Sequence, residues 1–420
     1  MLGVENLIEE RILCLKCIKC GAEYPSNRIL SFCEKCGSSL DYIFNYDVIA
    51  NLVNKGILSK RPFNMWRYKE FLPIVDESKI VSIGEGGTPL IQAEKLAERL
   101  DLRLLYLKLD CCNPTGSFKD RGASAAISRA LELGVQTIVG YSTGNAGVAQ
   151  AAYAARAGLK SVIFVHRTAS LEKLVQAMLH GSLVVRVDGT FEDAANLARE
   201  CSKEFGWMFN GGVINPTRHH GKKTIAYEIC EQMNWNVPDM YIQSVGVGTA
   251  AIGTYKGFKE FYELGWIDRI PRIVCVQAEG CAPMVDAFKN NREEIVPVKD
   301  PKTVASAIAV GNPAGWPMLR KAVLETNGIV DSVSDTEILE AEMMLARLEG
   351  VFAEPAAAAP IALLKKLREN GEIDKDTKVV CMISGHGLKA LKTATKLVGE
   401  LPKIPPRFEA FKKYYENLWT

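Results

Sequence analysis

The sequence has little of what marks a membrane protein or a nucleic-acid-binding protein. Its 420 residues carry a net charge of only +2, so no bulk field favours nucleic acid or an anionic membrane. No stretch approaches the roughly 20 consecutive apolar residues of a membrane span. The start, "MLGVENLIEERILC", has no basic segment followed by an apolar core, as a secretory signal would. We therefore expect a cytoplasmic globular protein that binds neither membranes nor nucleic acid.

Cysteine is the residue whose distribution stands out. Five of the 12 cysteines fall between residues 14 and 36, where Cys17-x-x-Cys20-Gly21 and Cys33-x-x-Cys36-Gly37 form two similar pairs. Two such knuckles supply the four thiolates of a closed tetrahedral zinc site, so we predict a structural zinc ribbon with Cys17, Cys20, Cys33 and Cys36 as ligands. Three alternatives remain open: a ligand set shifted to the Cys14/Cys17 pair, a site that holds no metal, and cysteines that are free thiols. A zinc ribbon can also be a nucleic-acid module, but this one lacks a long basic run.

From about residue 100, short apolar runs alternate with longer stretches of helical period. The runs "TIVGYS", "SVIFVH", "LVVRVD", "DMYIQSVG", "RIVCVQA" and "KVVCMISG" are typical of buried strands. Strand–helix alternation predicts parallel sheets covered by helices, which is the α/β class. The length and the 48% hydrophobic content favour two domains with large cores.

Three glycine-rich turns follow predicted strands: "YSTGNAG" (141–147), "SVGVGTAAIG" (244–253) and "ISGHGLKA" (383–390). Such a turn points backbone N–H groups at a shared crevice, where the dipole of the following helix favours an anion. Gly246-x-Gly248-x-x-Ala251 also fits a dinucleotide fingerprint, but its next acidic residue, Glu279, lies far downstream. The pattern alone is weak evidence for NAD.

The segment "NPTGSFKDRG" places Lys119 at a turn before a predicted helix. A lysine in this setting, combined with a glycine cradle for a phosphate, suggests pyridoxal phosphate, whose aldehyde forms a Schiff base with a lysine amine. Gly116 and Ser117 let the turn pass close to the ring, and Phe118 can pack beside it. A surface lysine in an ordinary capped helix is the plain alternative.

These motifs occur in the order and spacing of the fold-type II pyridoxal-phosphate enzymes, the tryptophan synthase β-like group. The stretches "WRYKEFLP", "GEGGTPL", "INPTR", "ASAIAVGNPAGWP" and "EGVFAEPAAAAP" narrow this, and the chain resembles the threonine synthase family over nearly its whole length. The resemblance implies a dimeric lyase of threonine biosynthesis that converts O-phosphohomoserine and water into threonine and phosphate. We expect a zinc ribbon (1–46), a large α/β domain (47–113 and 209–420) and a small α/β domain (114–208), with the cofactor between the two.

The resemblance also assigns roles. Lys119 matches the Schiff-base lysine and general base, Asn145 the partner of the ring hydroxyl, and Ser384 the hydroxyl residue beside the ring nitrogen. Gly246, Val247, Gly248, Thr249 and Ala250 match the loop that holds the cofactor phosphate. Positions around the substrate carboxylate and phosphate are matched by Thr88, Ser142, Thr143, Gly144 and Arg218.

Several positions depart from the family's usual pattern. Ala146 and Val247 stand where polar residues are common, and Gly212-Val213 replaces a polar pair. The usual "RLEGQKT" reads "RHHGKKT" at residues 218–224. This is either family drift with a solvated basic turn, or a change of substrate. The second reading makes the chain a paralogue that catalyses β-replacement or elimination, such as a cysteate synthase acting on O-phosphoserine and sulfite, or a threonine dehydratase. A nucleic-acid-binding protein with a degenerate enzyme body is a third alternative.

Overall fold

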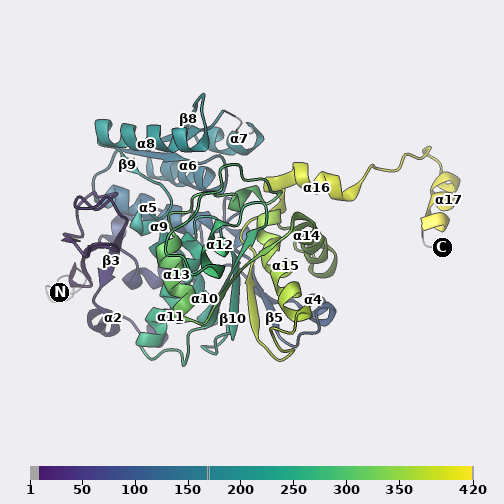
Figure 1. The fold of residues 1–420 in the computed structure, drawn as a ribbon, viewed down its shortest axis with the longest axis horizontal. Helices are drawn as coiled ribbons and strands as arrows, with labels where there is room; N and C mark the ends of the chain where they lie inside the picture. Colours follow the sequence, from purple (N-terminus) through teal and green to yellow (C-terminus); the bar gives the residue numbers. More distant parts are fainter. Residues whose placement is uncertain (1–8, 168, 170, 419–420) are drawn as a thin grey trace.

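The computed structural model describes residues 9–418, apart from residues 168 and 170. Its N-terminal part is a small antiparallel sheet in the order β2-β1-β3, with the bounds β1 (Ile12–Cys17), β2 (Glu23–Tyr24) and β3 (Leu40–Phe44). Gly21 and Gly37, which follow the two Cys-x-x-Cys pairs, both have a φ of +71°, a conformation that glycine adopts without strain. This part lies against one side of the body (Figure 1).

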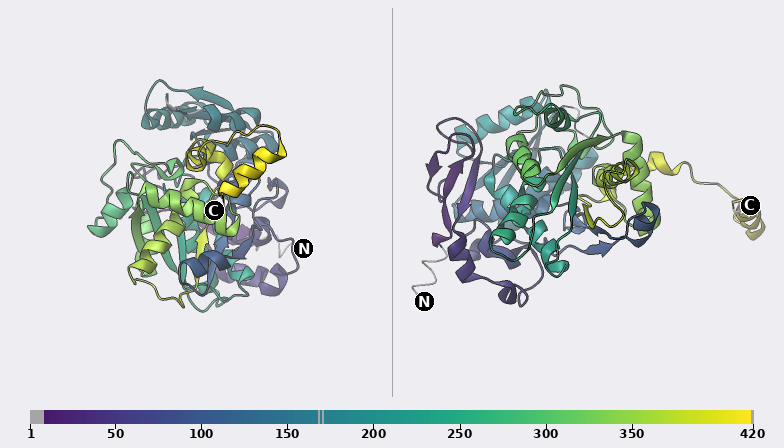
Figure 2. Two further views of the ribbon diagram at one scale, coloured as in Figure 1. Left: turned by 90° about the vertical axis from the view of Figure 1, so that its right-hand side faces the viewer. Right: turned by 60° about the horizontal axis from the view of Figure 1, so that its bottom comes forward.

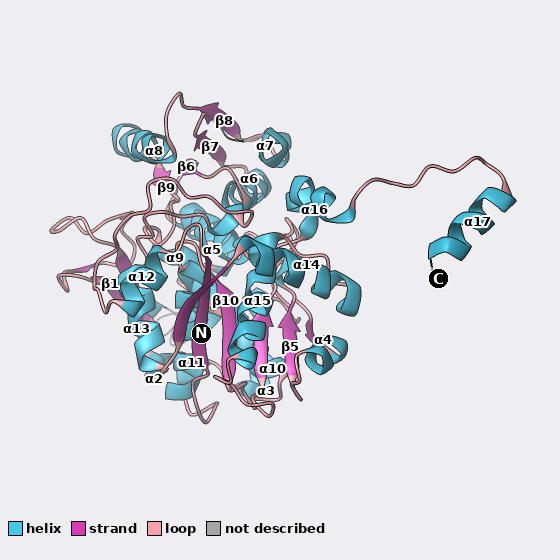
Figure 3. Ribbon diagram, turned by 45° about the vertical axis from the view of Figure 1, so that its right-hand side comes forward, coloured by secondary structure: helices cyan, strands magenta, loops and turns pink. Residues whose placement is uncertain are grey.

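The largest sheet has six strands in the order β12-β11-β10-β13-β5-β4, all parallel except for the edge strand β4. Its bounds are β4 (Leu90–Gln92), β5 (Leu105–Lys108), β10 (Met240–Ser244), β11 (Arg272–Ala278), β12 (Ile329–Val333) and β13 (Val379–Met382). Strand β13, near the end of the chain, therefore pairs with β5, which lies more than 260 residues earlier. Figure 3 shows β5 and β10 among the strands of this sheet.

A second sheet has four parallel strands in the order β8-β7-β6-β9. Its bounds are β6 (Thr137–Tyr141), β7 (Lys160–Val165), β8 (Leu183–Arg186) and β9 (Met208–Phe209). All six apolar runs named above form strands of the two parallel sheets, and the α/β class is confirmed. Strands β4, β5, β9 and β12 lie outside those runs. The domain boundaries given above remain a prediction.

Helices cover both parallel sheets (Figure 2). Those near the smaller sheet are α6 (Asn145–Ala157), α7 (Leu171–Leu179) and α8 (Phe191–Phe205). Those of the larger part are α4 (Glu94–Arg99), α9 (Pro216–Lys222), α10 (Thr224–Gln232), α11 (Thr249–Glu263), α12 (Pro283–Lys289), α13 (Trp316–Glu325), α14 (Asp335–Glu349) and α15 (Pro355–Glu369). Short helices α2 (Tyr46–Leu52) and α3 (Lys55–Leu58) follow the ribbon. Helix α5 (Lys119–Glu132) packs on both α6 and α9 and so connects the two parts.

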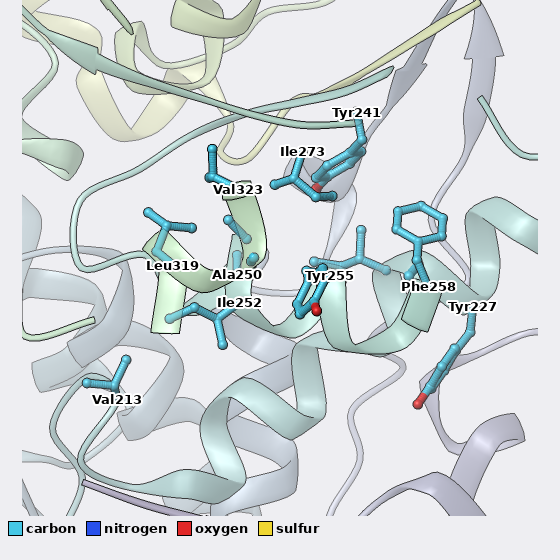
Figure 4. Packing of buried hydrophobic residues seen from close by; sticks show 14 of the residues in the cluster. Val213, Tyr227, Tyr241, Ala250, Ile252, Tyr255, Phe258, Ile273, Leu319 and Val323 are labelled. Atoms are coloured by element: carbon cyan, nitrogen blue, oxygen red, sulfur yellow. The ribbon is translucent and has the colours of Figure 1, made fainter. Parts of the chain in front are cut away.

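Side chains alternate across the large sheet, as a two-sided parallel sheet requires. Tyr241 and Ile273 face the cluster formed with α10, α11 and α13, as Figure 4 shows. Their neighbours Ile242 and Val274 face the opposite cluster, which α4, α14 and α15 complete. The first cluster continues into the cysteine-containing sheet, so this N-terminal sheet shares a core with the main body of the protein.

Local sequence signals mark where two of these helices begin. Thr190 and Asp193 form a reciprocal capping box at the start of α8, and Ser334 and Glu337 do the same for α14.

The last helices, α16 (Leu391–Val398) and α17 (Phe408–Leu418), lead away from the body (Figure 1). Within the described part of the chain, no helix is both long enough and apolar enough to span a membrane.

Candidate active site

Lys119 is the first residue of α5, and two glycine-rich segments meet just before it. Gly116 has a φ of +80°, and the Phe118 backbone N–H donates to the Ser384 carbonyl at 3.0 Å. Ser117 also forms an isolated antiparallel bridge with Gly385. The lysine motif and the "SGHG" turn after β13, separated by more than 260 residues, are therefore hydrogen-bonded neighbours.

The Lys119 amine has the properties of a nucleophile. Its side chain is only partly exposed, and its Nζ lies 3.6 Å from the centre of the Phe118 ring. Burial, together with the positive charge of Arg218, lowers the pKa of Lys119 to about 7, although Glu354 opposes the shift. A sizeable fraction of the amine is therefore neutral at physiological pH, as covalent chemistry with a carbonyl compound requires.

The glycine loop between β10 and α11 forms an anion cradle. Gly248 caps α11 with a φ of +92°, which a residue with a Cβ rarely adopts. A Cβ on Gly246 would lie 3.1 Å from Val310 and 3.3 Å from Ile308, so the backbone there is closely packed. Thr249 is the first residue of α11, whose unpaired N–H groups and dipole favour a phosphate.

Asn145, in the "STGN" turn after β6, is held by a carboxylate that received no role in the sequence analysis. Asn145 Nδ2 donates to Glu354 Oε1 at 2.9 Å, and the Glu354 N–H donates to the Gly385 carbonyl. Glu354 precedes α15 without forming a side-chain capping hydrogen bond at the start of that helix. It lies in the quoted "EGVFAEPAAAAP" stretch, and an acidic residue directed away from its own helix is visible only in the fold.

Ser142, Thr143 and Gly144 precede Asn145 and are partly exposed, and the Gly144 N–H donates to Ser142 Oγ at 3.3 Å. Ser384 is only 4% exposed. Arg218 is buried and donates to the Asn210 carbonyl at 2.9 Å. Its burial lowers the pKa of the guanidinium to about 10.

The basic segment after Arg218 is not a solvated turn. The structure places residues 216–224 in α9 and the start of α10, and all of them are buried. His219 and His220 direct Nε2 at the same oxygen of Asp41 in β3, at 2.9 and 2.8 Å. Burial lowers the pKa of His219 to about 4, so its ring is neutral and donates to the carboxylate. The reading of this segment as a solvated basic turn is therefore wrong.

Two lysines in this segment point in different directions. Lys223 Nζ pairs with Glu260 at 2.8 Å, away from Lys119. Lys222 Nζ lies 3.1 Å from Thr249 Oγ1 in the glycine loop and 5.7 Å from the centre of the Phe118 ring. Lys222 thus lies between the lysine motif and the anion cradle.

Thr88 has a different setting from the other predicted substrate residues. It is buried, and its hydroxyl donates to Asp110 at 2.8 Å and accepts from Arg121 at 3.1 Å. Because these partners hold the hydroxyl in a buried ion network, the geometry gives no support to a substrate contact.

The apolar departures at the glycine loop are neighbours. A Cβ on Gly212 would lie 3.3 Å from Val247 Cγ1. Val213 is buried in the core, as Figure 4 shows. Two positions at which the family commonly has polar groups are therefore in contact.

Comparisons with known proteins agree with this geometry. Residues 81–385 match the family described as pyridoxal-phosphate dependent enzyme. The threonine synthase of Methanocaldococcus jannaschii is 44% identical over 405 residues, which are 96% of this chain and 99% of the relative. That of Methanosarcina acetivorans is 41% identical over 401 residues, 95% of this chain and 98% of the relative.

Solved structures show the same fold. Maize serine racemase superimposes with a TM-score of 0.63 at 21% identity, covering 79% of this chain and 94% of that one. Threonine deaminase isoform 2 from Solanum lycopersicum superimposes with a TM-score of 0.64 at 24% identity, covering 74% of this chain and 83% of that one. The lysine motif, the glycine loop and the full-length relatives therefore agree: the chain belongs to the pyridoxal-phosphate dependent enzymes and, within them, to the threonine synthase family.

Proposed function

We propose that the protein is a threonine synthase, a pyridoxal-phosphate-dependent lyase that converts O-phosphohomoserine and water into threonine and phosphate. The observation that carries the proposal is the arrangement around Lys119. An amine with a pKa of about 7 lies beside the "SGHG" turn, and Lys222, near Phe118 of the lysine motif, contacts Thr249 of the glycine loop. Relatives of almost equal length that are named threonine synthase support the choice of reaction.

The residues present fit pyridoxal phosphate. The glycine loop Gly246–Ala250 would hold its phosphate, with backbone N–H groups and the N-terminus of α11 as donors. Lys119 would hold the cofactor covalently, with Phe118 beside it, Asn145 would bind the ring hydroxyl, and Ser384 would contact the ring nitrogen. When bound, the cofactor withdraws electrons from the substrate carbons, so that protons can leave them.

The roles of the chain's own residues follow from this placement. Lys119 has a pKa near neutrality, so it can accept the protons that leave Cα and Cβ of the substrate. After phosphate leaves from Cγ, it can return one proton to Cγ and one to Cα, while the hydroxyl of water adds at Cβ. Ser142, Thr143 and Gly144 would orient the substrate carboxylate, and Arg218 would bind its phosphate. Ser384 offers the ring nitrogen a neutral hydroxyl in place of a carboxylate, which suits elimination and replacement reactions.

A substrate panel tests this function. The purified enzyme is incubated with O-phosphohomoserine, O-phosphoserine with and without sulfite, threonine and serine, while phosphate release, amino-acid products and cofactor absorbance are recorded. We expect threonine and phosphate from O-phosphohomoserine. Val247 beside Gly212, where polar groups are common in the family, favours one alternative, a β-replacing or eliminating paralogue such as a cysteate synthase or a threonine dehydratase. A response only to another compound would establish that alternative.

We also propose that the four-cysteine group binds a structural zinc ion. The sulfur atoms of Cys17, Cys20, Cys33 and Cys36 lie within 4.8 Å of one another, which suits a tetrahedral thiolate site. Cys14 pairs with Ile43 inside the ribbon sheet and is not in this group, which favours the unshifted ligand set.

Replacing one ligand should separate the metal from the cofactor. We expect Cys33→Ser to lose about one zinc ion per chain and to lower the thermal midpoint. Binding of pyridoxal phosphate should stay within about twofold of wild type, since no cysteine lies among the proposed cofactor contacts. Elemental analysis and cofactor titration measure both, with Cys14→Ser as the matched control that keeps its zinc. Loss of zinc and cofactor together would contradict a purely structural role.

The resemblance leads us to propose, in addition, a cytoplasmic homodimer that acts on a small phosphorylated amino acid and binds neither nucleic acid nor membranes. Light scattering on the purified protein measures the oligomeric state, and salt-dependent binding to DNA or RNA would contradict the absence of nucleic-acid partners.

A further inference from the structure

The side chain of Lys222 occupies space that two glycines leave open. Lys222 is the last residue of α9 and has no exposed area. A Cβ on Gly122 of α5 would lie 3.0 Å from Lys222 Nζ, and a Cβ on Gly253 of α11 would lie 2.9 Å from Lys222 Cβ. The lysine therefore runs between α5 and α11 towards the N-terminal end of α11, where its amine meets the Thr249 hydroxyl at 3.1 Å.

The charge of Lys222 is not balanced as the charges of comparable lysines are. Lys108 and Lys223 are also fully buried, and each forms an ion pair with a glutamate, at 2.7 and 2.8 Å. Among the described residues, no carboxylate forms such a pair with Lys222. The charges that act on it are those of Arg218 and Lys119, both positive. A buried cation among cations is costly unless an anion joins it.

We infer that Lys222 is the cation that binds the phosphate group of pyridoxal phosphate at the start of α11. The inference rests on the cofactor assignment in the proposed function and adds a side-chain contact to a phosphate cradle otherwise built from backbone N–H groups. An ammonium group and a phosphate form a stronger hydrogen bond than an amide and a phosphate.

The geometry favours the cofactor phosphate over the substrate phosphate. Thr249, the partner of Lys222, belongs to the loop assigned to the cofactor, whereas Arg218 remains for the substrate. Lys222 also lies 5.7 Å from the ring of Phe118, the residue next to the covalent lysine, so it is within the span of one cofactor molecule.

Titration of the cofactor-free enzyme with pyridoxal phosphate and, separately, with pyridoxal tests the inference. We expect Lys222→Gln to raise the dissociation constant of pyridoxal phosphate about 10- to 100-fold and to change that of pyridoxal by less than about twofold. Lys222→Arg should retain most of the affinity for pyridoxal phosphate. Lys222→Met should raise the thermal midpoint of the cofactor-free enzyme, because an amine that is buried without a carboxylate partner is removed. It should also reduce the increase in thermal midpoint that pyridoxal phosphate produces. The matched control is Lys223→Gln, which should lower the thermal midpoint but leave the ratio of the two dissociation constants unchanged.

Three outcomes would overturn the inference: an unchanged dissociation constant for pyridoxal phosphate in Lys222→Gln, an equal loss for both ligands, or an effect confined to the KM for O-phosphohomoserine. The last would assign Lys222 to the substrate phosphate. The two titrations are independent of the reaction. If the wild-type enzyme fails to form threonine, the proposed function is refuted. If Lys222→Gln then still weakens the binding of pyridoxal phosphate but not of pyridoxal, the inference is kept.

Discussion

Lys119→Ala should reduce turnover by about 10³-fold or more and remove the visible absorption of the bound cofactor. The amine is both the covalent anchor of the cofactor and the group that moves protons at the substrate carbons. Its loss therefore removes both functions at once. Absorption spectra and phosphate release measure the two effects. Because Lys119 is partly exposed and forms no ion pair among the described residues, the variant should fold normally, which far-UV circular dichroism checks.

Lys321→Ala is the matched control, since this lysine is largely exposed on α13 and pairs only weakly with Glu325 at 3.6 Å. It should be indistinguishable from wild type in absorption and in turnover. A full absorption band in Lys119→Ala would refute the assignment of the covalent lysine.

Cofactor capture should depend on pH through the same amine. Burial and Arg218 lower the pKa of Lys119 to about 7, and the neutral amine is the reactive form. The rate at which the cofactor-free enzyme takes up pyridoxal phosphate should therefore rise with pH and reach half of its maximum near pH 7. A midpoint near the ordinary lysine value of 10.5 would contradict the site's effect on the amine.

Glu228→Leu should cause the largest loss of stability that we expect from one substitution, about 3–5 kcal/mol. Glu228 is fully buried and accepts from Arg121 Nη1 at 2.5 Å and from Lys108 Nζ at 2.7 Å. Asp110, which pairs with Arg121 at 2.8 Å, would be left facing two buried cations alone. The network ties α10 to β5 and to α5, the helix that Lys119 begins, so activity should fall as well. Urea unfolding monitored by fluorescence measures the change.

The control for this experiment is Glu23→Gln, which breaks an exposed pair with Lys16 and should leave the free energy of unfolding almost unchanged. The pH dependence gives a second check. The two cations lower the pKa of Glu228 from 4.5 to about 2. The contribution of Glu228 to the free energy of unfolding should therefore be complete above about pH 4.5 and be lost as the pH falls towards 2. An unfolding midpoint of Glu228→Leu equal to that of wild type would contradict the role of the network.

Much of the fold and part of the candidate site follow from local sequence signals. Apolar runs mark β6 and β10, because parallel strands buried on both faces are continuously hydrophobic. Gly116 and Gly248 stand where the backbone adopts a positive φ, so these turns could be located without a structure. Lys119 could be singled out because it follows such a turn at the start of a helix.

The tertiary structure decided which partners the charged and polar groups near the candidate site have. His219 and His220 are adjacent to Arg218 in the sequence, yet both are directed at Asp41, almost 180 residues earlier. Glu354 reaches Asn145 across 209 residues. Thr88 is drawn into an ion network by Asp110 and Arg121.

The sequence by itself determined the α/β class, the cysteine knuckles, the turns and the position of Lys119, because each depends on a few neighbouring residues. Only the tertiary structure decided that Lys223 has a carboxylate partner and that Lys222 contacts Thr249 in the glycine loop instead. Two lysines that are adjacent in the sequence point in different directions, and their electrostatic environments depend on the residues that distant segments bring beside them.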